Sequence, residues 1–138
     1  MIAYLDTSVL LRWFLREPGY LTDFSDYKQF YSSAITRVES RRTLHRLFLL
    51  ESFSEDQYVA RMSELSRFLE CLFLIDLGKS ILRRAEEPFP FAIGSLDAIH
   101  LSSALFVRDK APLVFLTHDT QLAKNAAALD LRVVGVDF

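Results

Sequence analysis

Four acidic side chains lie where the sequence predicts a strand to end or a helix to begin. Asp6 directly follows the apolar run IAYL, and Asp119 follows VFLTH. Glu39 lies in SSAITRVESRRTL and Asp97 lies in GSLDAIHLSSAL, each near the expected start of a helix. Taken one at a time, these acids fit helix caps, a capping box of Thr36 with Glu39, or charges favoured by the helix dipole. Their shared placement favours one common site.

Carboxylates within a few ångströms of each other repel, so such a site needs either a proton or a cation. Ligands that offer only oxygen suit Mg²⁺ or Mn²⁺, and the chain lacks the Cys and His spacing of a zinc site. A cation held there can activate water and offset the charge of a phosphodiester. The sequence therefore predicts metal-dependent phosphodiester hydrolysis, in which Asp6, Asp97 and Glu39 bind the first ion and Asp119 completes the site. In-line attack by activated water would leave a 5′-phosphate and a 3′-hydroxyl.

Basic side chains recur on the predicted helix that carries the second acidic motif. Arg37, Arg41 and His45 are spaced four residues apart, and Arg42 with Arg46 forms a second row. A solvated helix face is the ordinary explanation of such a run, but beside an acidic metal site these residues would contact the backbone of a nucleic acid. The formal net charge of −2 and the pI near 5.9 provide no overall basic field, so any such contact has to be local.

Short apolar runs typical of strands alternate with stretches of helical period, which predicts βαβ units and a parallel sheet. The expected strands are 2–5, 30–34, 72–76, 114–117 and 132–136. The expected helices are 8–15, a short piece near 20–27, a long pair within 36–70, and then 79–86, 96–108 and 120–129. Together they indicate one three-layer α/β domain over residues 1–138.

Local signals place the ends of several of these elements. Ser54 and Gln57 predict a capping box, and Ser95 is a natural N-cap for the helix that follows it. An open parallel sheet binds ligands outside the carboxyl ends of its strands, where Asp6 would lie. Thr7 or Ser8 is expected to cap the first helix, which would leave the Asp6 carboxylate free to face that crevice.

Composition restricts the class of protein. Hydrophobic residues make up 51% of the chain, which is ample for one core. The single cysteine, Cys71, cannot form an internal disulfide and lies in an apolar run, so it is expected to be buried. No apolar stretch approaches the roughly 20 residues that cross a bilayer, and the N-terminus lacks the features of a signal peptide. We therefore expect a cytoplasmic location and no membrane partner.

The motifs resemble, in order and spacing, the PIN-domain ribonucleases, and among them the VapC-type toxins of type II toxin–antitoxin pairs. The matching segments are YLDTSVLL, SSAITRVESRRTL, SLDAIHLSSAL and FLTHDTQLAKNAAALDLRVVG, whereas residues 54–90 carry no motif. The resemblance implies a PIN-like α/β/α sandwich with a five-stranded parallel sheet. It also implies Mg²⁺- or Mn²⁺-dependent endonucleolytic cleavage of RNA, a homodimer, and neutralisation by a VapB-like antitoxin.

Position by position, the same resemblance assigns roles to particular side chains. The family's acidic quartet corresponds here to Asp6, Glu39, Asp97 and Asp119. The hydroxyl residues that support the family's site correspond to Thr7, Ser8 and Thr117. Two histidines flank the acids, His100 and His118, and both are expected to be structural or to support the site from outside.

Two other functions remain open on the sequence alone. An aspartate after the first strand also marks phosphatase and phosphotransfer domains, in which Asp6 would carry the phosphoryl group. The haloacid-dehalogenase pattern wants a second Asp two positions later, where this chain has Ser8, and the acidic pair and lysine of a receiver domain are not clearly present. The alternative from a different class is a catalytically silent PIN-like binding module.

Overall fold

A parallel β-sheet forms the middle of the molecule. The computed structural model describes residues 1–137, and within them the sheet has five strands in the order β3-β2-β1-β4-β5. The strands are β1 (Ile2–Leu5), β2 (Gln29–Ser33), β3 (Phe73–Ile75), β4 (Leu113–Leu116) and β5 (Arg132–Val134). Every neighbouring pair is parallel, so all the carboxyl ends lie at one edge. The predicted strands are confirmed, with ends that differ by at most two residues.

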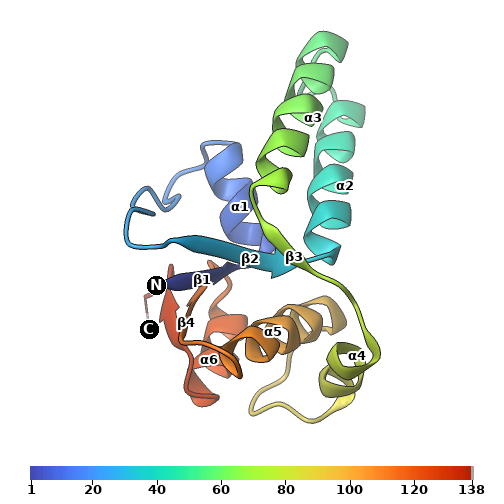
Figure 1. Ribbon diagram of the computed structural model, residues 1–138. Helices are drawn as coiled ribbons and strands as arrows, with labels where there is room; N and C mark the ends of the chain where they lie inside the picture. Colours follow the sequence, from blue (N-terminus) through green and yellow to red (C-terminus); the bar gives the residue numbers. More distant parts are fainter. Residues whose placement is uncertain (138) are drawn as a thin grey trace.

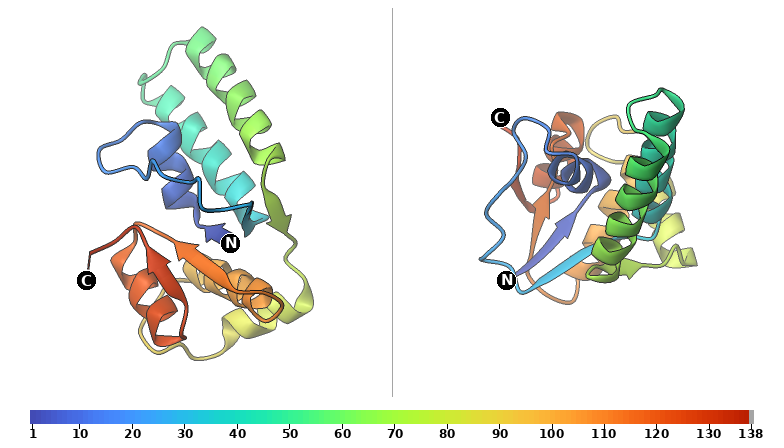
Figure 2. Two further views of the ribbon diagram at one scale, coloured as in Figure 1. Left: turned by 60° about the vertical axis from the view of Figure 1, so that its left-hand side comes forward. Right: turned by 90° about the horizontal axis from the view of Figure 1, so that it is seen from above.

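Helices cover both faces of the sheet, as Figures 1 and 2 show. One face carries α1 (Thr7–Phe14), α2 (Ile35–Leu49) and α3 (Glu55–Glu70). The other carries α4 (Lys79–Glu86), α5 (Ser95–Arg108) and α6 (Thr120–Ala128). The predicted three-layer α/β/α fold is therefore confirmed. The hairpin of α2 and α3 projects well beyond the sheet (Figure 1).

Strand β1 separates two apolar cores. Ala3 and Leu5 face the core shared with α1, α2 and α3, whereas Tyr4 faces the core shared with α5 and α6. This alternation follows from the period of two in a strand. Tyr4 is fully buried and stacks on Phe115 of β4 with ring centroids 5.5 Å apart. A central parallel strand is buried on both faces, which explains the continuous apolar run of β1.

The short helix expected near 20–27 is absent, and the segment forms an irregular loop. Leu21, Phe24 and Tyr27 recur every three residues, yet each packs against the core individually from a loop. The Asp23 carboxylate accepts hydrogen bonds from the backbone and hydroxyl of Ser25, a local turn that competes with helix formation. The apolar spacing was real, but it does not belong to a helix.

Helix caps agree with the sequence at one position and differ at another. Ser54 and Gln57 form the predicted capping box at the start of α3. Ser95 does not cap α5, because Gly94 occupies the N-cap position and no side chain caps that end. Helix α5 therefore begins one residue earlier than expected.

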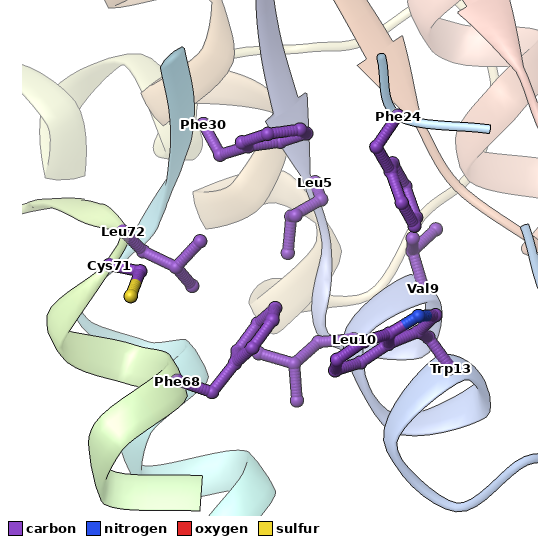
Figure 3. A pocket seen from close by; sticks show the side chains of 9 residues that line it. All are labelled: Leu5, Val9, Leu10, Trp13, Phe24, Phe30, Phe68, Cys71 and Leu72. Atoms are coloured by element: carbon purple, nitrogen blue, oxygen red, sulfur yellow. The ribbon is translucent and has the colours of Figure 1, made fainter. Parts of the chain in front are cut away.

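An apolar cavity of about 200 Å³ lies between α1, α3 and the sheet (Figure 3). Its walls include Leu10, Trp13, Phe30 and Phe68, and Cys71 lies at its margin. Cys71 is exposed, so the expectation of a buried thiol was wrong. The lining offers no charged group for a phosphodiester.

Among residues 1–137, no helix combines the length and the apolar character needed to cross a bilayer.

Candidate active site

Asp6 lies at the carboxyl end of β1 and is 4% exposed. Its Oδ1 accepts hydrogen bonds from the Ser8 hydroxyl at 2.5 Å and the Val9 backbone at 3.2 Å, and its Oδ2 accepts one from the Thr117 hydroxyl at 2.6 Å. Asp6 is thus the N-cap of α1, and the expectation that Thr7 or Ser8 would take this role was wrong. The reason is that Ser8 donates to Asp6 itself, while Thr7 is turned toward another acid.

Thr117 connects the ends of β1 and β4. Its hydroxyl donates to Asp6 and accepts a hydrogen bond from the Asp119 backbone N–H at 3.0 Å. The Asp119 carboxylate in turn accepts from the backbone N–H of Leu122 at 2.7 Å and caps α6. Two of the predicted acids therefore follow neighbouring strands and are connected through one buried hydroxyl.

Glu39 reaches the same edge from α2. Its Oε1 accepts hydrogen bonds from Thr7 Oγ1 at 2.7 Å and from His100 Nε2 at 2.8 Å. The capping box of Thr36 with Glu39 is not formed, because Ala34 is the N-cap and the Thr36 hydroxyl pairs with Ser32 at 2.7 Å. Burial would raise the pKa of Glu39, but the hydrogen bonds from His100 and Thr7 outweigh it and lower that pKa.

Asp97 lies in the first turn of α5, where its pKa is affected by the charges of the other three acids. Burial raises its pKa first, and the negative charges of Asp119, Asp6 and Glu39 raise it further, against a smaller opposite effect of His100. These contributions decay with distance, so the four carboxylates occupy one neighbourhood at the carboxyl edge of the sheet.

The cluster is open rather than closed. Within residues 1–137, no group of three or more Asp, Glu, His or Cys side chains is gathered tightly enough to hold an ion. The assignment of the four acids as ligands of one ion stays a prediction. What the structure shows is a looser arrangement, with Asp6 and Glu39 fixed by hydroxyls and Asp97 under the repulsion of its neighbours.

The predicted basic face of α2 divides into two groups. Arg41 Nη2 donates to the Ser66 hydroxyl of α3 at 2.7 Å, and the His45 ring lies 6.1 Å from the ring of Tyr58, also on α3. These two side chains face the neighbouring helix. The solvent-exposed basic residues of the set are Arg37, Arg42 and Arg46. Spacing placed the residues on rows, but it could not show which row faced α3.

Comparison with known proteins identifies the family. The family model of the PIN domain matches residues 3–128. This chain belongs to the PIN domain family. It is 34% identical to "Ribonuclease VapC35" of Mycobacterium tuberculosis, in strains CDC 1551 / Oshkosh and H37Rv, over 141 residues that cover 96% of each protein. The resemblance to PIN domains of the VapC type is thereby confirmed.

Solved structures share the fold of this PIN domain. A toxin–antitoxin complex from Klebsiella pneumoniae matches with a TM-score of 0.67 and 19% identity, covering 99% of this chain and 96% of that one. VapBC2 from Rickettsia felis, bound to a promoter DNA fragment, matches with a TM-score of 0.65 and 18% identity over 97% and 98%. VapBC-1 from nontypeable Haemophilus influenzae gives 0.58 and 16% over 97% of each chain.

His100 was expected to be structural or to support the site from outside, and the structure buries it beneath the acids of this PIN domain. It is 2% exposed, and its Nδ1 lies 2.8 Å from the Tyr4 hydroxyl while its Nε2 contacts Glu39. The buried partners Tyr4 and Ser32 went unnoticed in the sequence. Ser32 donates to the carbonyl oxygen of Leu5 at 2.7 Å. The available signal was a hydroxyl in an otherwise apolar strand, since a buried polar group needs a partner.

Proposed function

We propose that this PIN domain is a metal-dependent endoribonuclease and the toxin of a toxin–antitoxin pair. The main support is that acids from separate elements meet at one edge of the sheet: Asp6 and Asp119 follow the neighbouring strands β1 and β4, and Glu39 reaches the same edge from α2. Burial raises the pKa of Asp97 there, and repulsion by these carboxylates raises it further. Such repulsion is relieved by a divalent cation. The family membership and the relative named as a ribonuclease point to the same activity.

The donor set fits Mg²⁺ or Mn²⁺, because every candidate ligand is a carboxylate oxygen. Asp6, Glu39 and Asp97 would hold the ion, and Asp119 would complete the site. When bound, the cation supplies Lewis-acid activation of water and neutralises charge on the phosphodiester.

The chain's own residues prepare this site before any ligand arrives. Ser8 and Thr117 orient the two oxygens of Asp6, and Thr7 orients Glu39. The exposed side chain of Arg37 on α2 would contact RNA phosphates, as would those of Arg42 and Arg46. Cleavage is expected to leave a 5′-phosphate and a 3′-hydroxyl, and a 2′,3′-cyclic phosphate product would contradict this mechanism.

The activity is tested by incubating RNA with the purified protein in Mg²⁺ or Mn²⁺. Asp6→Asn and Asp97→Asn should each abolish most cleavage, whereas Asp76→Asn should not, because Asp76 is an exposed acid at the end of the edge strand β3. Equal cleavage by all four proteins would refute the assignment. Sequencing the RNA ends after expression in cells would identify the substrate among transfer, ribosomal and messenger RNA.

The proposed partners are a VapB-like antitoxin and a second copy of this chain. The structural neighbours that are toxin–antitoxin complexes support the antitoxin. Co-expression with a VapB-like antitoxin should give a stable complex that does not cleave RNA. Light scattering should give twice the mass of the chain, and a cytoplasmic location is tested by cell fractionation.

The structure disfavours a phosphotransfer role for Asp6. The haloacid-dehalogenase pattern has a second Asp two positions after the first, and this chain has Ser8 there, whose hydroxyl donates to Asp6 Oδ1 at 2.5 Å. That position therefore lacks the second acid of the pattern. Stable phosphorylation of Asp6 by acetyl phosphate would overturn this conclusion.

A further inference from the structure

We propose that Tyr4 and His100 form a buried relay that holds a proton on His100 Nε2 and thereby positions the Glu39 carboxylate. The relay runs from the apolar core between the sheet and α5 to the acidic edge. It rests on the proposed function in that Glu39 is one of the proposed metal ligands. The hydrogen bonds of the relay, however, form without metal or RNA. In the relay, His100 is a positioning residue, because a side chain that is 2% exposed does not touch substrate.

Packing fixes both members of the relay. Tyr4 is fully buried on the central strand and is held between its stacked neighbour Phe115 and the edge-on ring of His100, whose centroid lies 6.0 Å away. The Tyr4 hydroxyl is 2.8 Å from His100 Nδ1. His100 therefore has little freedom to rotate, and its Nε2 points to Glu39 Oε1 at 2.8 Å.

The chemistry of the Glu39 end assigns the proton on Nε2. The Tyr4 hydroxyl can both donate and accept, so it can pair with Nδ1 whether or not that nitrogen carries a proton. The carboxylate of Glu39 only accepts, so the Nε2–H group meets the one partner that needs a donor.

The relay has a consequence for how Glu39 meets a ligand. His100 and Thr7 both donate to Oε1, which leaves Oε2 as the oxygen for a cation. Partners of this kind orient a ligating side chain, and losing one typically weakens metal binding by about 10- to 100-fold. Thr7 alone would leave the carboxylate free to rotate about its remaining hydrogen bond.

The tautomer is tested by long-range ¹H–¹⁵N spectroscopy of the full-length protein without metal. The His100 signals, identified by their loss in His100→Gln, should show the proton on Nε2. In Tyr4→Phe, which keeps the ring but removes the hydroxyl, Nε2 should lose part of its proton occupancy. A ring with its proton on Nδ1 alone in the unsubstituted protein would overturn the proposal.

Positioning is tested by two substitutions of similar size and polarity. Gln places its amide nitrogen near the position of Nε2 and can donate to Glu39, whereas Asn reaches only the position of Nδ1. Mn²⁺ affinity measured by electron paramagnetic resonance should therefore fall about 10-fold or more in His100→Asn and about threefold or less in His100→Gln. A merely structural role would weaken both alike, and that result would overturn the proposal.

The two tests separate this proposal from the proposed function. If the unsubstituted protein bound Mn²⁺ but cleaved no RNA, the nuclease assignment would fail while the ranking of Gln and Asn still decided the relay. If it bound no Mn²⁺ at all, the metal site would fail, and the tautomer in the unsubstituted protein and Tyr4→Phe would decide the relay.

Discussion

Glu39 and Asp97 are both partly buried acids at the same edge of the sheet, yet their pKa values move in opposite directions. Glu39 has donors on it, from Thr7 and His100, and these stabilise its ionised form. Asp97 has negative neighbours instead, chiefly Asp119 and Asp6 after burial itself. Within one cluster, the chain thus stabilises the ionised form of Glu39 and destabilises that of Asp97. A cation would therefore relieve the most repulsion at Asp97.

The raised pKa of Asp97 predicts how stability depends on pH without metal. Its folded state holds the proton more tightly than the unfolded state, whose ordinary value is 3.8, so its contribution is present below that pH and lost as pH rises through the folded pKa. Glu39 acts oppositely, with a contribution present above 4.5 and lost as pH falls. Asp97→Asn should therefore gain stability relative to the unsubstituted protein as pH rises from about 3 to 7.

Urea unfolding in the presence of a chelator, at intervals over that range, measures this difference. The difference between Asp97→Asn and the unsubstituted protein should change with pH, whereas Asp76→Asn, whose carboxylate is exposed, should follow the unsubstituted curve. Parallel curves for Asp97→Asn and the unsubstituted protein would contradict the raised pKa.

Metal should stabilise the folded protein through the same residue. At a Mn²⁺ concentration 100 times the dissociation constant, binding to the folded state alone adds about 2.7 kcal/mol, or roughly 8 °C in Tm for a chain of this size. Asp97→Asn should lose most of that shift, and a chelator should reverse it in the unsubstituted protein. Calorimetry with and without Mn²⁺ measures the effect, and a full shift in Asp97→Asn would remove this residue from the site.

At the scale of elements, the site depends on how the ends of β1 and β4 are joined. Thr117→Val keeps the shape of the side chain but removes the hydroxyl that donates to Asp6 and accepts from Asp119. The buried Asp6 oxygen then lacks a donor, so the free energy of unfolding should fall by about 1–3 kcal/mol. Thr43→Val is the control, because its hydroxyl donates only to the Glu39 carbonyl oxygen along α2. Equal urea midpoints for the two variants would contradict this view of Thr117.

The α2–α3 hairpin predicts different results for two arginines on the same helix. Arg41 is bonded to Ser66 across the hairpin, so Arg41→Ala should lower the free energy of unfolding by about 1–2 kcal/mol. Arg37 is exposed, so Arg37→Ala should leave stability within about 0.5 kcal/mol and weaken RNA binding instead.

RNA affinity measured in a chelator, so that no cleavage occurs, completes this comparison. Arg37→Ala should reduce the slope of affinity against salt by about 0.7 if it removes one phosphate contact. The opposite pattern, with Arg37→Ala unstable and Arg41→Ala defective only in binding, would show that the exposed face of α2 does not meet RNA.

At the scale of the whole molecule, the fold could be predicted because its strongest signals are periodic. The central strand IAYL is apolar throughout, since the sheet is covered on both faces, and strand-type runs alternate with helical ones. Contacts that depend on rotation could not be predicted. Which side of α2 meets α3, whether Asp6 or Ser8 caps α1, and how Tyr4 reaches His100 are all set by packing between distant segments.

The short helix predicted in the irregular segment between α1 and β2 was wrong for a related reason. Its apolar residues recur at a spacing near that of a helix, but their positions satisfy the core and not a local hydrogen-bond pattern. Periodicity reports burial, and burial alone does not define the backbone. The four acids were located by type and position, whereas the openness of their cluster depends on side-chain rotamers.

Two cores on opposite faces of one sheet predict a single cooperative unfolding transition. Leu65 of α3 and Leu122 of α6 are each fully buried, one in each core. Leu65→Ala and Leu122→Ala should each lower the free energy of unfolding by about 2–5 kcal/mol. Leu50→Ala should stay within about 0.5 kcal/mol, because Leu50 is 69% exposed. Separate transitions by fluorescence and circular dichroism in either core variant would show that the faces unfold independently.

The three hydrogen bonds to Asp6 order its carboxylate during folding, before any ligand binds. Because two hydroxyls and a backbone N–H fix both oxygens, the rotational freedom of this side chain is lost when the chain folds. When a ligand binds later, the Asp6 carboxylate is already ordered, so binding costs no further rotational entropy at this side chain. We therefore expect the ordering cost of binding a ligand to fall more on Asp97, at the start of α5, than on Asp6.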